Sequence, residues 1–148
     1  GGNLSLVAAM LGSKSELDTD GKILFLEEVS EYKYTLDRML MSLKRSGKLD
    51  KLAGLIIGGI TATKADAETP FAMSVEEIIF EKVADKNFPV CFNFPASHIR
   101  NNMALKLGIY YTFRVTETGG SLTEMSTTLP LVPLPDIDSL LTPPEILP

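Results

Sequence analysis

An apolar run that ends in two acids, Ile23-Leu24-Phe25-Leu26-Glu27-Glu28, sets the architecture of this chain. Because a strand that is covered on both faces shows no polar alternation, these residues predict a buried strand over residues 23–26. Similar short runs occupy residues 52–57, which end at Gly58-Gly59, and residues 89–94. Helical segments separate the three runs. This order predicts an α/β fold with a parallel core sheet of three strands.

Three segments have the spacing of amphipathic helices. Residues 3–11 place apolar side chains at helical intervals behind Asn3, which can cap the first turn. Residues 34–46 carry an apolar stripe along one face and end at a glycine. Ser74, with Glu77 three residues later, forms a capping box that predicts the start of a third helix. The second and third helices supply the crossovers that parallel strands require.

The C-terminal part of the chain has a different pattern. Residues 109–116 and 121–125 resemble strands on either side of Gly119-Gly120, which predicts a β meander or hairpin. Six of the nine prolines fall in the last 20 residues, and proline cannot donate a backbone hydrogen bond to a central strand. We therefore expect one domain over residues 1–128 and an extended Pro-rich tail over residues 129–148.

Composition narrows the class of protein. The chain has 148 residues, with 14 Lys and Arg against 19 Asp and Glu, and no basic run of the kind that binds a phosphate backbone. One cysteine, Cys91, and one histidine, His98, cannot build a disulfide framework or a Cys/His zinc site. No apolar segment reaches the roughly 18 residues of a membrane span. We expect a soluble domain that has no nucleic-acid partner, no membrane span and no structural metal.

Polar residues collect at the expected carboxyl ends of the three strands. Glu27 and Glu28 follow the first strand, Gly58-Gly59 follows the second, and His98 lies just past the third. Parallel strands open their carboxyl ends onto one edge, which is where α/β proteins place their chemistry. A carboxylate that orients an imidazole forms two members of a hydrolytic triad. The spacing leaves open the alternative that these are solvated carboxylates and an unrelated surface histidine.

Other candidates for chemistry are weaker. Cys91 alternates with apolar neighbours in a strand, which favours a buried thiol over a nucleophile. Ser97 adjoins His98, but neighbours on an extended loop usually point apart, so the two do not make a convincing Ser-His pair. Glu31, Tyr32 and Tyr34 lead into the second helix, and we expect them to serve its first turn and its packing. A substrate-facing role for Glu31 or Tyr32 is the alternative. No nucleophile for a triad is evident in these residues.

Three segments of the sequence resemble a known family. Residues 21–32, continuing to Leu36-Asp37-Arg38-Met39-Leu40, resemble the C-terminal domain of the LD-carboxypeptidases, also called muramoyltetrapeptide carboxypeptidases. The opening Gly2-Asn3-Leu4-Ser5-Leu6 resembles the start of that domain. Phe94-Pro95-Ala96-Ser97-His98, followed by Asn102 and Gly108, resembles its histidine loop. The resemblance covers roughly residues 1–117.

The resemblance implies a division of labour between two domains. An N-terminal α/β domain would carry the nucleophilic serine and most of the oxyanion hole, and this chain would be the C-terminal domain, of the swivelling β/β/α type. By the resemblance, Glu27 is the triad glutamate, with Glu28 and Glu31 as lesser candidates, and His98 is the triad base. The residue before the histidine is usually glycine in such loops, whereas here it is Ser97.

The function that the resemblance implies is hydrolysis of the amide bond to the terminal D-alanine of murein tetrapeptide. This reaction belongs to cytoplasmic peptidoglycan recycling and needs no metal or organic cofactor. The isolated chain would then be inactive. One alternative is a relative that cleaves peptidyl-nucleotide antibiotics of the microcin type, and another is a non-catalytic interaction domain. The face that would meet the serine domain should be open and apolar near Phe94 and Ile99, so we expect self-association, as a homodimer, through this face or the tail.

Overall fold

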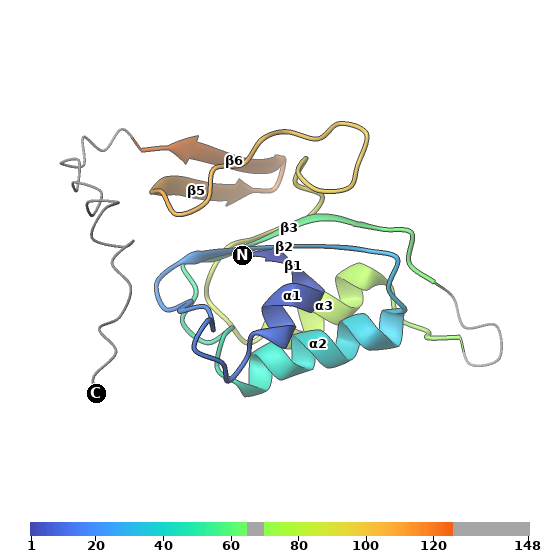
Figure 1. Ribbon diagram of the computed structural model, residues 1–148. Helices are drawn as coiled ribbons and strands as arrows, with labels where there is room; N and C mark the ends of the chain where they lie inside the picture. The colour runs from blue at the N-terminus through green and yellow to red at the C-terminus, as the bar shows by residue number, and fades with distance from the viewer. Residues whose placement is uncertain (65–69, 126–148) are drawn as a thin grey trace, which may run out of the picture.

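A parallel sheet of four strands lies at the centre of the computed structural model, which describes residues 1–64 and 70–125 (Figure 1). The strands lie in the order β1-β2-β3-β4 and all three pairings are parallel. Their bounds are Gly2–Asn3 for β1, Ile23–Val29 for β2, Gly54–Thr61 for β3 and Val90–Cys91 for β4. The predicted α/β fold is confirmed, but the prediction of three core strands is wrong. The additional strand, β1, has only two residues, and no sequence pattern of that length can indicate a strand.

Three helices cover one face of this sheet (Figure 1). They are α1 (Leu4–Ala9), α2 (Lys33–Arg45) and α3 (Val75–Val83). The predicted caps are present, since the Asn3 side chain accepts a hydrogen bond from the Leu6 N–H and Ser74 forms a capping box with Glu77. Leucine and isoleucine side chains from the helices and the sheet form the main core between these layers. No helix of the described ranges is long and apolar enough to cross a membrane.

An antiparallel hairpin covers the other face (Figure 1). It consists of β5 (Tyr111–Thr116) and β6 (Gly119–Glu124), which confirms the predicted hairpin. The predicted turn is wrong, because Thr116 pairs with Gly119 and the turn is Glu117-Thr118. Gly120 lies inside β6, where a Cβ atom would approach the Cys91 sulfur to 3.0 Å. The absent side chain at this glycine therefore permits close packing on β4.

The strand bounds also differ from those that the apolar runs predict. β2 continues through Glu27 and Glu28, β3 continues through Gly58 and Gly59, and β4 is shorter than residues 89–94. Strand bounds depend on backbone partners in other strands, so apolar runs locate them only approximately. The tail predicted over residues 129–148 lies outside the described residues.

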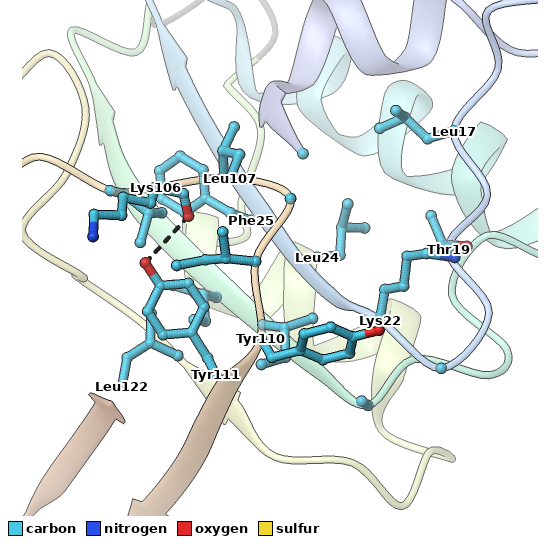
Figure 2. A pocket seen from close by; sticks show the side chains of 18 of the residues that line it. Leu17, Thr19, Lys22, Leu24, Phe25, Lys106, Leu107, Tyr110, Tyr111 and Leu122 are labelled. Carbon is cyan, nitrogen blue, oxygen red and sulfur yellow. Dashed lines mark hydrogen bonds between the residues drawn. The ribbon is translucent and has the colours of Figure 1, made fainter. Parts of the chain in front are cut away.

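A cavity of about 590 Å³, partly open to solvent, lies between the hairpin and the sheet (Figure 2). Its lining is mostly apolar and includes Leu24, Phe25, Leu107 and Tyr110, while the Tyr111 hydroxyl donates to the Lys106 carbonyl at its rim. Neither Glu27 nor His98 lines it. The cavity therefore belongs to a loosely packed layer and lies away from the polar residues that the sequence singles out.

Candidate active site

Glu27 and His98 meet near the carboxyl end of β2, although 71 positions separate them in the chain. The His98 Nδ1 atom lies 2.9 Å from the Glu27 Oε2 atom. The Glu27 side chain is 9% exposed and the imidazole is 61% exposed. The predicted contact is confirmed, and the alternative of a solvated carboxylate beside an unrelated histidine is wrong. Since an ionised carboxylate only accepts hydrogen bonds, Nδ1 donates and Nε2 remains the basic nitrogen of the ring.

The neighbouring acid, Glu28, points to the opposite face of the sheet, as alternation along a strand requires. Its Oε1 atom accepts from the Asn3 side chain and the Val29 N–H, and its Oε2 atom accepts from the Ser5 N–H and hydroxyl, at 2.6 to 2.9 Å. Burial alone would raise the pKa of Glu28, but these hydrogen bonds outweigh burial and lower its pKa below the ordinary value. Glu28 therefore anchors the first turn of α1 as a carboxylate.

Only one of the three candidate acids contacts the histidine. No hydrogen bond joins the Glu28 or Glu31 side chain to His98 in the part of the chain that the structure describes. The Glu31 backbone carbonyl accepts from the Lys64 N–H. The geometry thus favours Glu27 as the partner of the imidazole.

Two glycines form a bare surface beneath the histidine loop. The register between β2 and β3 shifts here, since Leu26 pairs with Ile57 and Glu28 pairs with Ile60. Glu27 therefore lies opposite both Gly58 and Gly59, as in a β-bulge. A Cβ atom at Gly58 would lie 2.3 Å from the Ala96 carbonyl oxygen, and one at Gly59 would lie 2.4 Å from the Ser97 hydroxyl. The loop can lie this close to β3 only because both side chains are absent.

Ser97 occupies a conformation that glycine adopts far more readily, with φ of 146°. Its hydroxyl donates to the Gly59 carbonyl at 3.2 Å, and its N–H donates to the Asn102 Oδ1 atom at 3.0 Å. The hydroxyl is therefore directed at β3 rather than at the imidazole, in agreement with the prediction that Ser97 and His98 point apart. The sequence did not indicate these two hydrogen bonds, because φ cannot be read from residue types.

The other candidate residues are packed against neighbouring side chains or partly buried. Cys91 is half-buried, and burial raises the pKa of its thiol, which disfavours the reactive thiolate. The Tyr32 ring stacks on the Tyr34 ring with centroids 5.2 Å apart, and the Lys64 ammonium lies 5.5 Å from the Tyr32 ring. Phe94 and Ile99 are both half-buried. Self-association through this face stays a prediction.

No metal centre is formed by the described ranges. Within residues 1–64 and 70–125, no three His, Cys, Asp or Glu side chains lie close enough together to hold a metal ion. The pair at the sheet edge is a single carboxylate and a single imidazole with one nitrogen turned to solvent. This arrangement defines the class as an α/β domain that presents an exposed imidazole held by a buried carboxylate.

Comparison with known proteins identifies the family. The model of the LD-carboxypeptidase C-terminal domain matches residues 1–113, and the chain belongs to this family. The chain is 33% identical over 108 residues to a protein of Bacillus subtilis named "Probable murein peptide carboxypeptidase", covering 73% of this chain and 34% of that protein. It is also 33% identical over 109 residues to the murein tetrapeptide carboxypeptidase of Pseudomonas aeruginosa, with the same coverage. The chain therefore spans about a third of the length of these relatives.

Solved structures give the same assignment. The muramoyltetrapeptide carboxypeptidase of Oxalobacter formigenes superimposes with a TM-score of 0.70 at 25% identity, over 85% of this chain and 44% of that chain. The microcin C7 self-immunity protein superimposes with a TM-score of 0.57 at 26% identity, over 66% of this chain and 29% of that chain. Both fold and sequence thus relate the chain to the C-terminal part of larger proteins of this family.

Proposed function

We propose that this chain supplies the base and the orienting acid of a serine carboxypeptidase that releases the terminal D-alanine of murein tetrapeptide. The observation that carries the proposal is the 2.9 Å contact between His98 Nδ1 and Glu27 Oε2 beneath an exposed ring. The names of the relatives from Bacillus subtilis and Pseudomonas aeruginosa support a murein peptide as the substrate. The serine and most oxyanion donors would come from an N-terminal α/β domain, and the reaction would serve cytoplasmic peptidoglycan recycling.

The proposed roles follow from the protonation pattern of the pair. With Nδ1 donating to Glu27, the lone pair of Nε2 can accept the proton of the serine hydroxyl as its oxygen attacks the scissile carbonyl. The Glu27 carboxylate would stabilise the imidazolium that results. Nε2 would then return this proton to the nitrogen of the departing D-alanine. Hydrolysis of the acyl-enzyme would repeat the sequence with water in place of serine.

The surroundings of the two residues suit these roles. Glu27 belongs to a strand that is paired on both sides, and its side chain is largely withdrawn from water. A carboxylate in such a position holds one geometry and interacts with the imidazole at lower effective dielectric than on the surface. The ring, by contrast, is exposed and can face a second domain. This asymmetry supports a base that acts on a group from outside the described residues.

The alternative substrate class is a peptidyl nucleotide. The chain is 27% identical over 127 residues to the microcin C7 self-immunity protein of Escherichia coli, and its structural match to that protein is weaker than to the muramoyltetrapeptide carboxypeptidase. A non-catalytic interaction domain would not need a contact between Glu27 and His98. We therefore favour the murein peptide hydrolase.

The decisive experiment measures D-alanine release in a protein that joins this chain to a serine-bearing N-terminal domain of the family. Murein tetrapeptide and a peptidyl nucleotide would be offered separately to the wild type and to the His98→Ala variant. We expect release of D-alanine that depends on His98. Preferred cleavage of the peptidyl nucleotide would favour the alternative substrate class. Release of D-alanine at a normal rate by His98→Ala would refute the proposed role of His98 as the base.

A further inference from the structure

The contacts of the His98 imidazole do not by themselves fix the position of the ring. Only the hydrogen bond to Glu27 holds the imidazole through a side-chain contact among the described residues, and 61% of the side chain is exposed. The Glu27 carboxylate is withdrawn from water, but water competes for the exposed imidazole, so this one contact holds the ring only weakly. The ring can therefore stay aligned only if the backbone places its Cα atom and limits its rotamers.

The backbone just before His98 is attached to β3 at several points. The Gly59 N–H donates to the Ala96 carbonyl at 3.4 Å, and the Thr61 hydroxyl donates to the His98 carbonyl at 3.5 Å, both of them long contacts. The Phe94 N–H donates to the Ile57 carbonyl of β3 at 2.9 Å, and the Ser97 hydroxyl donates to the Gly59 carbonyl of β3 at 3.2 Å. The Ser97 N–H donates within the loop, to the Asn102 Oδ1 atom at 3.0 Å. Within residues 96–98, Ser97 therefore makes the shortest attachment to β3.

The conformation of Ser97 supports the same conclusion. A residue with a side chain remains at φ of 146° only where surrounding interactions determine its conformation. Glycine would adopt this φ without strain, but glycine cannot donate through a side chain. Ser97 therefore has a strained backbone, but its hydroxyl makes a hydrogen bond to Gly59 that a glycine could not make.

We propose that Ser97 and Asn102 are positioning residues: Ser97 ties the peptide before His98 to β3, and Asn102 holds that peptide from within the loop, so that the imidazole is aimed at Glu27 before a substrate binds. The inference rests on the proposed function and adds to it the residues that prepare the base. Ser97 acts through its hydroxyl, and Asn102 acts through its amide oxygen. Neither side chain touches the imidazole, so neither is a catalytic residue.

The test observes the ring directly. His98 is the only histidine, so the ¹⁵N resonances of its imidazole need no further assignment and report which nitrogen carries the proton. Spectra of the chain would be recorded at a pH where the ring is neutral, for the wild type, Ser97→Ala, Ser97→Gly and Asn102→Ala. We expect the wild type to hold its proton on Nδ1. In each variant the ratio of held to free ring should fall about fivefold, the change that one lost hydrogen bond causes.

A matched control separates this effect from a general loss of hydroxyls. Ser42 lies near the C-terminal end of α2, away from the carboxyl edge of the sheet, and its hydroxyl donates to the Arg38 carbonyl at 2.9 Å. Ser42→Ala should leave the imidazole resonances unchanged. Ser97→Gly relieves the backbone strain, so it keeps the test valid if Ser97→Ala fails to fold.

Wild-type ¹⁵N shifts in folded Ser97→Gly and Asn102→Ala would overturn the proposal. The outcome is independent of the proposed function, because the resonances report ring position without a substrate. If the variants lose the Nδ1 proton while His98→Ala retains full activity in the joined protein, positioning stands and the catalytic proposal fails. If His98→Ala abolishes activity while the ring stays held in all variants, the catalytic proposal stands and the positioning proposal fails.

Discussion

The two faces of the parallel sheet differ in how much they bury. Among residues 1–64 and 70–125, the helix-covered face has fourteen buried apolar residues in one cluster, from Leu4 in α1 to Val83 in α3. Within the same ranges, the cluster of the hairpin-covered face has three buried members, Phe25, Ile56 and Ala96. The open cavity lies on this second face (Figure 2). Burial of apolar surface is the main source of stability, so the helix face should hold the fold together.

The same division separates the two acids at the end of β2. Glu28 points to the helix face and binds the start of α1, whereas Glu27 points to the hairpin face and meets His98. Glu28 already accepts four hydrogen bonds, from Asn3, Ser5 and Val29, so its carboxylate has no free position for a substrate. The comparison teaches that one step along a strand separates an acid that anchors a helix from the acid that we propose for the chemistry.

The largest effect should come from removing His98, the proposed base on the hairpin face. His98→Ala, in a protein that joins this chain to a serine-bearing N-terminal domain of the family, should lower the turnover number by about four to six orders of magnitude, as loss of a triad member does. Because the ring is exposed, the melting temperature should stay within about two degrees of the wild type. A D-alanine release assay and calorimetry check both statements. A large loss of stability in His98→Ala would contradict the conclusion that the helix-covered face holds the fold together.

The next effect compares matched leucines on the two faces. Leu40 in α2 is fully buried, so Leu40→Ala should lower the free energy of unfolding by about 2–5 kcal/mol. Leu122 in β6 is only partly buried, so Leu122→Ala should cost about 1 kcal/mol. Urea unfolding of the chain measures both. Equal losses would show that the hairpin stabilises the fold as much as the helices do.

A smaller effect concerns the glycines beneath the histidine loop. Gly59→Ala places a Cβ atom 2.4 Å from both the Ser97 hydroxyl and the Ile99 side chain, so the loop must move. We expect a loss of about 1–3 kcal/mol and separation of His98 from Glu27, visible in the imidazole ¹⁵N shifts. Gly108→Ala is the control, because its Cβ atom would meet nothing within 4 Å and only backbone strain results. An unchanged imidazole spectrum in Gly59→Ala would contradict the role of the bare surface.

The smallest effect is a pH dependence from the helix face. The hydrogen bonds of Glu28 lower its pKa in the folded state below the ordinary value of 4.5, so its contribution to stability is complete above that value. It is lost as the pH falls through the folded pKa. Glu28→Gln should be less stable by about 1–2 kcal/mol at pH 7, and this difference should shrink below pH 4.5. Urea unfolding of both proteins between pH 3 and pH 7 tests this. A difference that stays constant with pH would assign the loss to packing alone.

Local patterns in the sequence sufficed for the helices and the order of the main elements. The capping box of Ser74 and Glu77, the stripe of α2 and the alternation of strands with helices all depend on residues a few positions apart. The structure confirms the order of these elements, and it confirms the bounds of α2 and the start of α3 within one position. Chain order and the rule that parallel strands share a carboxyl edge also predicted that Glu27 and His98 would meet.

Tertiary contacts decided what depends on distant partners. The two-residue strand β1, the extension of β2 through both acids and the shift that sets Gly58 and Gly59 against Glu27 all follow from hydrogen bonds between strands. The turn of the hairpin lies at Glu117-Thr118, and Gly120 pairs with Val115 inside the ladder, next to Cys91. Residue types are known before folding, but which backbone groups pair, and which of two neighbouring acids faces the histidine, is settled only when the strands pair and fix the register.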